Sequence, residues 1–292
     1  MTKEDLVRVL GPAPNKVPLN SKVIERSDKG DFEQILVEYD VELDERISAY
    51  VLIPTNATSN TPAVFCHHQH ASNFELGKSE IIGNSGDPSQ AIGPELASRG
   101  YVVIAPDAIA FEERNWSFPS GRAEYLEMAF RMIKGQTLLA KALHDVSVGI
   151  NYLCSLDTVD PKRIGFIGHS YGGRMALWAP AYDSRIKASA SNCGCVNYRD
   201  SLDREIGIQV EFCIPDILST GDVEDVVRLV APRALYISAT TGDKYSKGAQ
   251  AMYDYAKDAF PHGQLECKVW NGGHVFTKDM REAAYAFLDN KL

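Results

Sequence analysis

The feature that most constrains this chain is a series of short apolar runs that alternate with amphipathic segments after Pro62. The runs span residues 63–66, 101–105, 163–167, 186–190, 234–238 and 267–270. Between the second and third runs, Leu139, Leu143, Val146, Ile150 and Leu153 recur on one helix face. Buried strands separated by helices are typical of a parallel sheet that is covered on both faces. The pattern therefore predicts an α/β fold.

The N-terminal part of the chain has a different pattern. Residues 35–41 (ILVEYDV) and 47–53 (ISAYVLI) alternate apolar and polar side chains, which predicts two antiparallel strands. Residues 1–30 are polar and hold three prolines, so we expect an N-terminal arm outside the core. We predict one α/β domain over residues 31–292, with a mostly parallel central sheet of about eight strands, the first two antiparallel, flanked by helices.

Two long segments interrupt this alternation, at about residues 108–135 and 194–230. Connections longer than about 12–15 residues inside a compact domain are usually functional. Both segments follow predicted strands, and open α/β sheets bind ligands at the carboxyl ends of their strands. We expect these two insertions to shape a binding site.

Composition excludes several partners. Thirty basic and 39 acidic residues give a net charge of −9, which argues against nucleic acid and anionic membrane surfaces. No apolar stretch approaches the roughly 18 residues of a membrane-spanning helix. The first residues lack the apolar stretch of a secretory signal, so we expect a cytoplasmic protein. Six cysteines are too few for a disulfide scaffold in 292 residues, and a homo-oligomer is left open.

The strongest motif is Gly168-His169-Ser170-Tyr171-Gly172-Gly173, which follows the apolar run IGFI and precedes the helix-forming RMALWA. G-x-S-x-G between a strand and a helix is a nucleophile elbow, which exposes the serine hydroxyl on a sharp turn. A glycine-rich turn for close helix–strand packing is the alternative. We predict that Ser170 is a nucleophile.

A serine hydroxyl needs a base, and the base needs an acid that orients it. His274 follows the last predicted strand in the sequence NGGHVF, and it is our candidate for the base. A structural role in capping the last helix is its alternative. Asp243 is the carboxylate in the loop after ALYIS and our candidate for the acid, with Asp200 or Asp203 as the alternative. Asp243 otherwise serves only as a turn former.

The loop after the first buried run reads His67-His68-Gln69-His70. We expect it to supply the second oxyanion donor beside the Tyr171 N–H, with the Gln69 N–H first and His68 second. A metal site is the alternative, but adjacent histidines do not readily converge on one ion, and no acidic or cysteine partner is apparent in the sequence. We expect no metal and no other cofactor.

The first insertion carries aromatic residues that we expect to roof the substrate pocket. They are Phe111, Trp116, Phe118 and Tyr125. Trp116 and Phe118, with His68, are our candidate pocket residues. A packing cluster or a dimer surface is the alternative for these aromatics.

With these residues in place, the chain resembles the α/β-hydrolase superfamily, and within it the dienelactone hydrolase-like and acetyl xylan esterase-like branch. The similarity runs from about residue 49 to the C-terminus and rests on GHSYGG, FCHHQH, GGHVF, CGCVNYRDS and VAPRALYIS. The nucleophile is serine where dienelactone hydrolases carry cysteine, so their own activity is not implied. His68 replaces a small residue of the oxyanion loop, and Thr240 replaces a glycine of the acid loop.

The resemblance implies hydrolysis of a carboxylic ester, often an acetyl group on a sugar or a similar small acyl ester. We therefore predict a serine esterase that acts on a small-molecule ester without a cofactor. A lyase, an acyltransferase or a peptidase with the same triad is the alternative, followed by a non-catalytic binding protein of this fold.

Overall fold

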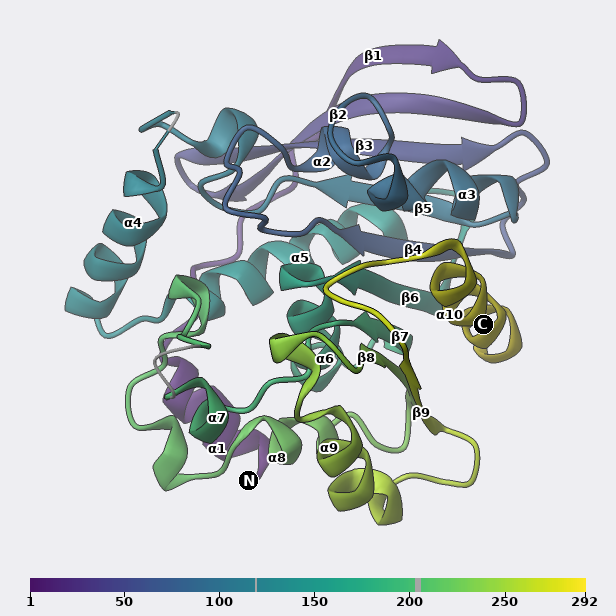
Figure 1. Ribbon diagram of the computed structural model, residues 1–292. Coiled ribbons are helices and arrows are strands. Elements are labelled where there is room, and N and C mark those ends of the chain that lie inside the picture. Colours follow the sequence, from purple (N-terminus) through teal and green to yellow (C-terminus); the bar gives the residue numbers. More distant parts are fainter. Residues whose placement is uncertain (119, 203–205) are drawn as a thin grey trace.

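The computed structural model describes residues 1–118, 120–202 and 206–292 (Figure 1). Its centre is a nine-stranded sheet in the order β1-β2-β3-β5-β4-β6-β7-β8-β9. The strands are β1 (Lys22–Asp28), β2 (Phe32–Glu42), β3 (Glu45–Pro54), β4 (Thr61–His67), β5 (Val102–Pro106), β6 (Val159–His169), β7 (Ile186–Asn192), β8 (Ala234–Thr240) and β9 (Leu265–Trp270). The first three pair antiparallel, β3 also pairs antiparallel with β5, and all the remaining pairs are parallel. The expected single-domain α/β fold is confirmed.

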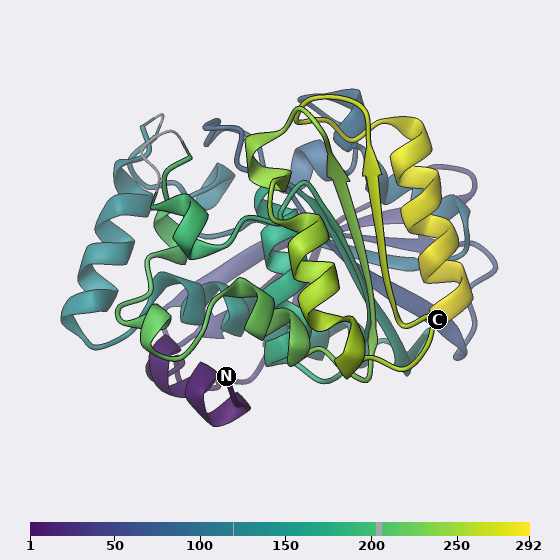
Figure 2. The same cartoon turned by 60° about the horizontal axis from the view of Figure 1, so that its bottom comes forward.

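Helices cover both faces of the sheet. They are α1 (Lys3–Leu10), α2 (Lys78–Ile81), α3 (Ile92–Ser98), α4 (Arg122–Ile133), α5 (Leu138–Cys154), α6 (Tyr171–Tyr182), α7 (Tyr198–Ser201), α8 (Val223–Arg228), α9 (Ala249–Ala256) and α10 (Lys278–Lys291). One buried cluster joins α1, α5, α6, α8 and α9 to one face, and a second joins α2, α3 and α10 to the other. Figure 2 shows α9 and α10 on either side of β8 and β9.

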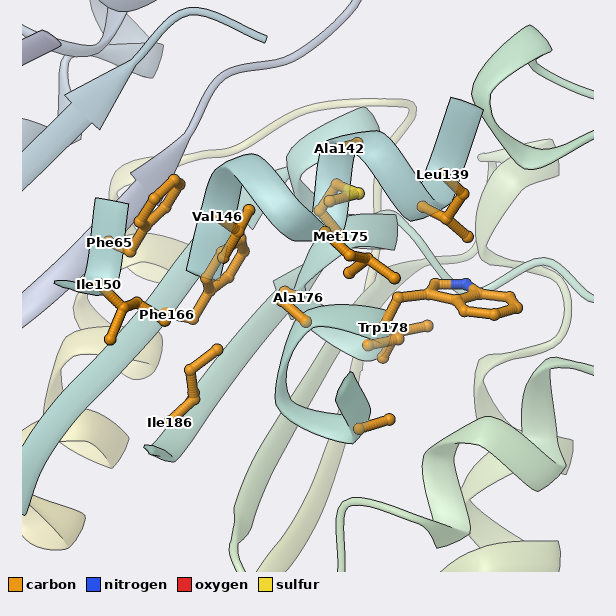
Figure 3. Close-up of a cluster of buried hydrophobic side chains, with 14 of the residues drawn as sticks. Phe65, Leu139, Ala142, Val146, Ile150, Phe166, Met175, Ala176, Trp178 and Ile186 are labelled. Carbon is orange, nitrogen blue, oxygen red and sulfur yellow. The ribbon is translucent and has the colours of Figure 1, made fainter. Parts of the chain in front are cut away.

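The strand sequences explain these two cores. Neighbouring residues of a strand point to opposite faces, so Phe65 of β4 enters one cluster while Val64 enters the other. In the first cluster Phe65 stacks on Phe166 of β6, with ring centroids 5.1 Å apart. Val146 of α5 packs beside this pair (Figure 3). Both faces of the central strands are buried, which fits their continuous apolar runs.

The N-terminal segment differs from the expected arm. Residues 22–28 form β1 at the edge of the sheet, paired with β2. In α1, Leu6 and Leu10 are buried in the first cluster. The prolines that suggested an arm lie between these two elements, at positions 12, 14 and 18. The polar composition of residues 1–30 wrongly suggested a segment outside the core, because a short helix needs only one apolar face to pack against it.

The two insertions lie over the ends of the strands and contact each other. The first contains α4, which stands apart from the sheet in Figure 1. The second contains α7, a short 3₁₀ helix η3 (Val210–Phe212) and α8. Contacts join α4 to η3. Over the described parts of the chain, no helix has the length and apolar character needed to cross a bilayer.

Candidate active site

Ser170 lies on the sharp turn between β6 and α6. Its backbone has φ +58° and ψ −110°, a strained conformation for a residue with a side chain. The turn requires the motif's glycines, because a Cβ on Gly168 would lie 2.4 Å from the backbone of Gly172. A Cβ on Gly172 would lie 2.2 Å from the carbonyl oxygen of His67. The elbow geometry therefore follows from the sequence around Ser170.

Tyr171 is the first residue of α6. The first N–H groups of a helix have no acceptor within it, and the helix dipole favours negative charge at this end. The backbone N–H of Tyr171 is thus suited to stabilise an anion beside Ser170. Its side chain is separate from this role, because the ring is buried and packs edge-on against His67, with centroids 4.6 Å apart.

His274 and Asp243 lie together on the loops after β9 and β8. Nδ1 of His274 is 3.1 Å from Oδ2 of Asp243. The Asp243 carboxylate also accepts hydrogen bonds from Ser246 Oγ at 2.6 Å and from the Tyr245 N–H at 3.0 Å. Burial alone would raise the pKa of Asp243, but the hydrogen bonds from His274 and Ser246 bring it below its usual value. The carboxylate is therefore ionised and fixed towards the imidazole.

Hydrogen bonds tie the two loops to each other. Thr240 donates its hydroxyl to the Gly273 carbonyl at 2.7 Å, and the Gly242 N–H donates to the Gly272 carbonyl at 2.8 Å. Thr240 stands where a glycine is more common in the resembled branch. Its hydroxyl reaches the residue before His274, so Thr240 connects the acid loop to the histidine loop.

His169 and Asn192 are supporting residues that the sequence analysis did not identify. Asn192, at the end of β7, donates from Nδ2 to His169 Nδ1 at 2.7 Å and to the Val275 carbonyl at 3.1 Å. The Asn192 carbonyl accepts the Ser170 N–H at 2.9 Å. The His169 ring also packs against His274, with centroids 4.6 Å apart. Asn192 thus links the nucleophile turn to the histidine loop, and the only sequence signal was its place at a strand end.

Ser170 and His274 line one cavity of about 370 Å³. Its other lining residues come from the predicted oxyanion loop, α6, the end of β7, both insertions and the acid loop: His70, Ala71, Ser72, Glu124, Arg174, Cys193, Ile206, Gly207, Ile208, Gln209, Val210 and Tyr245. Ser170 Oγ makes no hydrogen bond to any residue that the structure describes. Such bonds often tighten only when substrate binds.

The alternative acids are not placed at this site. Asp200 lies in α7 with its carboxylate exposed and away from the cavity lining, and its N–H donates to Asn197. Asp203 lies outside the described residues. Of the carboxylates that the structure describes, Asp243 is the one paired with His274.

The three histidines of the predicted oxyanion loop have different hydrogen-bond partners. His67 Nδ1 donates to the His68 carbonyl at 2.9 Å, and His68 Nδ1 donates to the Gln69 carbonyl at 2.7 Å. His68 Nε2 accepts the Ala108 N–H at 3.0 Å. Burial lowers the pKa of His67 to about 3 and that of His68 to about 4, so both imidazoles are neutral. These two histidines stiffen the loop, and the Gln69 side chain is held separately by Glu80.

His70 has acidic partners that the sequence did not reveal. Its Nε2 lies 2.7 Å from Oε1 of Glu124 in α4, and Glu211 of η3 completes a group with all three ligand atoms within 4.8 Å. His70 Nδ1 accepts the Ser72 N–H at 2.9 Å, so the neutral ring carries its proton on Nε2. This tautomer donates to Glu124 and leaves Nε2 no lone pair for a metal ion.

Glu211 is fully buried behind Glu124. Burial, followed by the nearby carboxyl group of Glu124, raises the pKa of Glu211 well above its usual value. The pKa of Glu124 is also raised, chiefly by burial. Both pKa shifts favour the protonated form, and the effect is strongest for Glu211.

The predicted pocket residues are elsewhere. His68 is fully buried beneath the loop, and neither Trp116 nor Phe118 is among the residues that line the cavity. Trp116 and Phe118 are more than half exposed, as is Tyr125. Phe111 is buried against Phe74 and His70, each with centroids 5.1 Å away. From the two insertions, the cavity wall instead receives Glu124 of α4 and residues 206–210.

Comparison with known proteins identifies a family and relatives with similar sequences. The Dienelactone hydrolase family matches residues 47–223. YtaP of Bacillus subtilis (strain 168) is 30% identical over 239 residues, which cover 79% of this chain and 77% of that protein.

Solved structures have the same fold at low identity. An acetyl xylan esterase from Paenibacillus sp. R4 superimposes with a TM-score of 0.67 at 19% identity, covering 100% of both chains. A glucuronoyl esterase from Solibacter usitatus superimposes with a TM-score of 0.69 at 18% identity, covering 97% of this chain and 88% of its own. Because the family match spans more than half of the chain and includes the Ser170 elbow, the chain belongs to the dienelactone hydrolase family, a family of carboxylic ester hydrolases in the α/β-hydrolase superfamily.

Proposed function

We propose that this chain is a serine esterase that hydrolyses a small, short-acyl carboxylic ester through an acyl-enzyme. Ser170 is the nucleophile, His274 the base and Asp243 the residue that orients the base. The observation that carries the proposal is the 3.1 Å contact of Asp243 with His274, which lines the same cavity as Ser170. Chain order Ser, acid, His is that of α/β-hydrolases.

In the first half-reaction, Ser170 Oγ attacks the ester carbonyl carbon while His274 Nε2 takes its proton. Asp243 accepts the Nδ1–H and stabilises the imidazolium that forms. The carbonyl oxygen becomes an oxyanion, and the N–H groups of Tyr171 and Gln69 are our proposed donors to it. The tetrahedral intermediate then expels the alcohol, which takes the proton from His274 Nε2.

In the second half-reaction, water attacks the acyl-enzyme and gives a proton to the same Nε2. The C–O bond to Ser170 breaks, the carboxylic acid leaves, and the serine recovers its proton. No cofactor enters either half-reaction. A cavity of about 370 Å³ favours a small substrate, and the similar acetyl xylan and glucuronoyl esterases support an ester of a carbohydrate or a related small alcohol.

The test is covalent labelling followed by ester kinetics. A fluorophosphonate probe should label Ser170 in the wild type, and labelling should vanish in Ser170→Ala. Ser184→Ala is the control, since Ser184 is exposed on a turn outside the cavity. Rates on p-nitrophenyl esters from acetate to octanoate should fall with acyl length. Labelling that survives in Ser170→Ala would refute the proposal.

A further inference from the structure

Arg174 is a buried cation beside the proposed nucleophile. It lies one turn after Ser170 on α6, so the two side chains project from the same face of the helix. Its guanidinium lines the cavity that Ser170 and His274 also line, and only 8% of the residue is exposed. The Arg174 guanidinium therefore brings a positive charge within reach of a substrate bound at Ser170.

Arg174 has no ion pair or hydrogen bond through its side chain to any residue that the structure describes. Its guanidinium instead lies over the rings of Phe212 and Tyr245, each 5.4 Å from the centroid. These rings hold the group in place but accept none of its N–H donors. Arg114 and Arg281, which are similarly withdrawn from solvent, each face a carboxylate. Buried charges are normally paired, so Arg174 is an exception that calls for a ligand.

The described carboxylates nearest to the cavity already have partners or are disfavoured as anions. Asp243 accepts from His274, Ser246 and Tyr245. Glu124 accepts from His70, and the raised pKa of Glu211 disfavours its charged form. Burial outweighs these neighbours and lowers the pKa of Arg174 below the usual arginine value, although an arginine stays charged at neutral pH. Among the residues that the structure describes, this charge is therefore largely uncompensated.

We propose that Arg174 binds a carboxylate carried by the substrate, so that the ester cleaved at Ser170 is an anionic one. A planar guanidinium matches a carboxylate in a two-point hydrogen-bonded pair. One helical turn is about 5.4 Å along the axis, so the carboxylate is separated from the ester carbonyl by a short carbon chain. This inference rests on the proposed esterase activity, and it names the class of substrate.

The experiment compares esters that differ only in charge. Methyl hydrogen glutarate is matched by methyl 4-carbamoylbutanoate, in which an amide replaces the acyl-side carboxylate. The pair 4-acetoxybutanoate and 4-acetoxybutanamide places the same difference on the alcohol side. We expect kcat/KM of the wild type to favour the anion in one pair by about 10- to 100-fold, the range of a charge-assisted hydrogen-bonded contact. The pair that shows it identifies the side of the ester that Arg174 recognises.

Arg174→Gln should lose far more kcat/KM on the anionic ester than on its amide. The control is Arg228→Gln, whose guanidinium pairs with Asp258 on the surface and lies outside the cavity, and it should keep the wild-type preference. Wild-type enzyme that cleaves both members of both pairs at equal rates would overturn the inference and leave the proposed esterase activity intact.

A binding measurement decides the site without turnover. Glutarate and 4-hydroxybutanoate, the anionic products of the two pairs, are titrated by calorimetry into Ser170→Ala and into Ser170→Ala with Arg174→Gln. We expect the first protein to bind one of them and the second to bind it at least about 10-fold more weakly. Failure of both anions to bind Ser170→Ala, or equal binding to both proteins, would overturn the inference even if no ester were cleaved.

Discussion

At the scale of single residues, the local sequence around Ser170 predicted more than the sequence around its partners. The glycines at positions 168 and 172 are needed because no side chain fits there, so the motif itself encodes the turn. Asp243 had no comparable signal, since a carboxylate in a loop is also common turn chemistry. The contact with His274 arises from the pairing of β8 with β9, which brings the two loops together. Thr240 and Asn192 then fix these loops through hydrogen bonds that no local sequence pattern predicts.

Replacing Asp243 with asparagine tests the proposed orienting role. The asparagine side chain presents an amide to His274 Nδ1, which favours the wrong tautomer of the base. We expect kcat to fall by about 10⁴-fold, as for loss of the acid in other triads, with little change in folding. The measurement is steady-state kinetics on a p-nitrophenyl ester, with Asp200→Asn as the control on exposed α7. A larger loss in Asp200→Asn would assign the acid to the second insertion.

At the scale of elements, the contact between the two insertions depends on a buried pair of acids. Glu124 of α4 and Glu211 of η3 belong to one group with His70. Glu211 is 0% exposed and has no hydrogen-bond donor among the described residues for either of its oxygens. A charged Glu211 would therefore be both desolvated and repelled by Glu124, and the protonated form is favoured by folding.

Glu211→Gln should make stability less dependent on pH. The pKa of Glu211 is raised in the folded protein, so folding binds a proton, and stability falls as pH rises from the unfolded pKa towards the folded one. The slope for one group is at most about 1.4 kcal/mol per pH unit. Between pH 5 and 8, we expect the unfolding free energy of Glu211→Gln to rise relative to that of the wild type, as measured by urea unfolding. The control is Glu266→Gln, because Glu266 is exposed on β9. A difference that stays constant over this range would contradict the prediction.

The N-terminal helix offers a second prediction at this scale. Leu10 is 1% exposed in the first core cluster, whereas Val7 of the same helix is 51% exposed. Leu10→Ala should lower the free energy of unfolding by about 2–5 kcal/mol, and Val7→Ala should change it by no more than about 0.5 kcal/mol. Urea unfolding measures both. Equal effects of the two substitutions would favour the arm that we first expected.

The fold was more predictable than the site for a physical reason. Core strands such as β4 are apolar on both faces, and this property is local to each segment. The cavity wall, in contrast, depends on which segments meet. Glu124 and Arg174 are ordinary polar residues of helices in the sequence, and only packing against η3 and the acid loop makes them lining residues. Trp116 and Phe118 misled us because aromatic residues in an insertion resemble a pocket roof.

At the scale of the whole molecule, a buried charge network joins parts that are distant in sequence. Lys141 of α5 is 0% exposed and lies 2.7 Å from Glu42, 2.5 Å from Glu45 and 2.8 Å from Asp145. Arg114, from the first insertion, pairs with the last two of these carboxylates. The network thus connects the β2–β3 turn, the longest helix of the described chain and the insertion that carries α4. Its cations are enclosed by acids, so removing one leaves negative charges facing each other.

Lys141→Met tests how much this network contributes to stability. Removing one partner of a buried ion pair leaves the others uncompensated, which costs about 3–5 kcal/mol.

Burial acts to raise the pKa of Glu45, but Arg114 and Lys141 lower it to about 2. The stabilisation is therefore present above the unfolded pKa near 4.5 and is lost as pH falls towards 2. We expect the unfolding free energy of Lys141→Met to lie furthest below the wild type near pH 7, with the gap narrowing on acidification. Lys257→Met, which removes an exposed pair with Asp254, should leave the unfolding free energy close to that of the wild type at all of these pH values. If both variants lose an equally small amount of unfolding free energy relative to the wild type, the network makes no net contribution to stability.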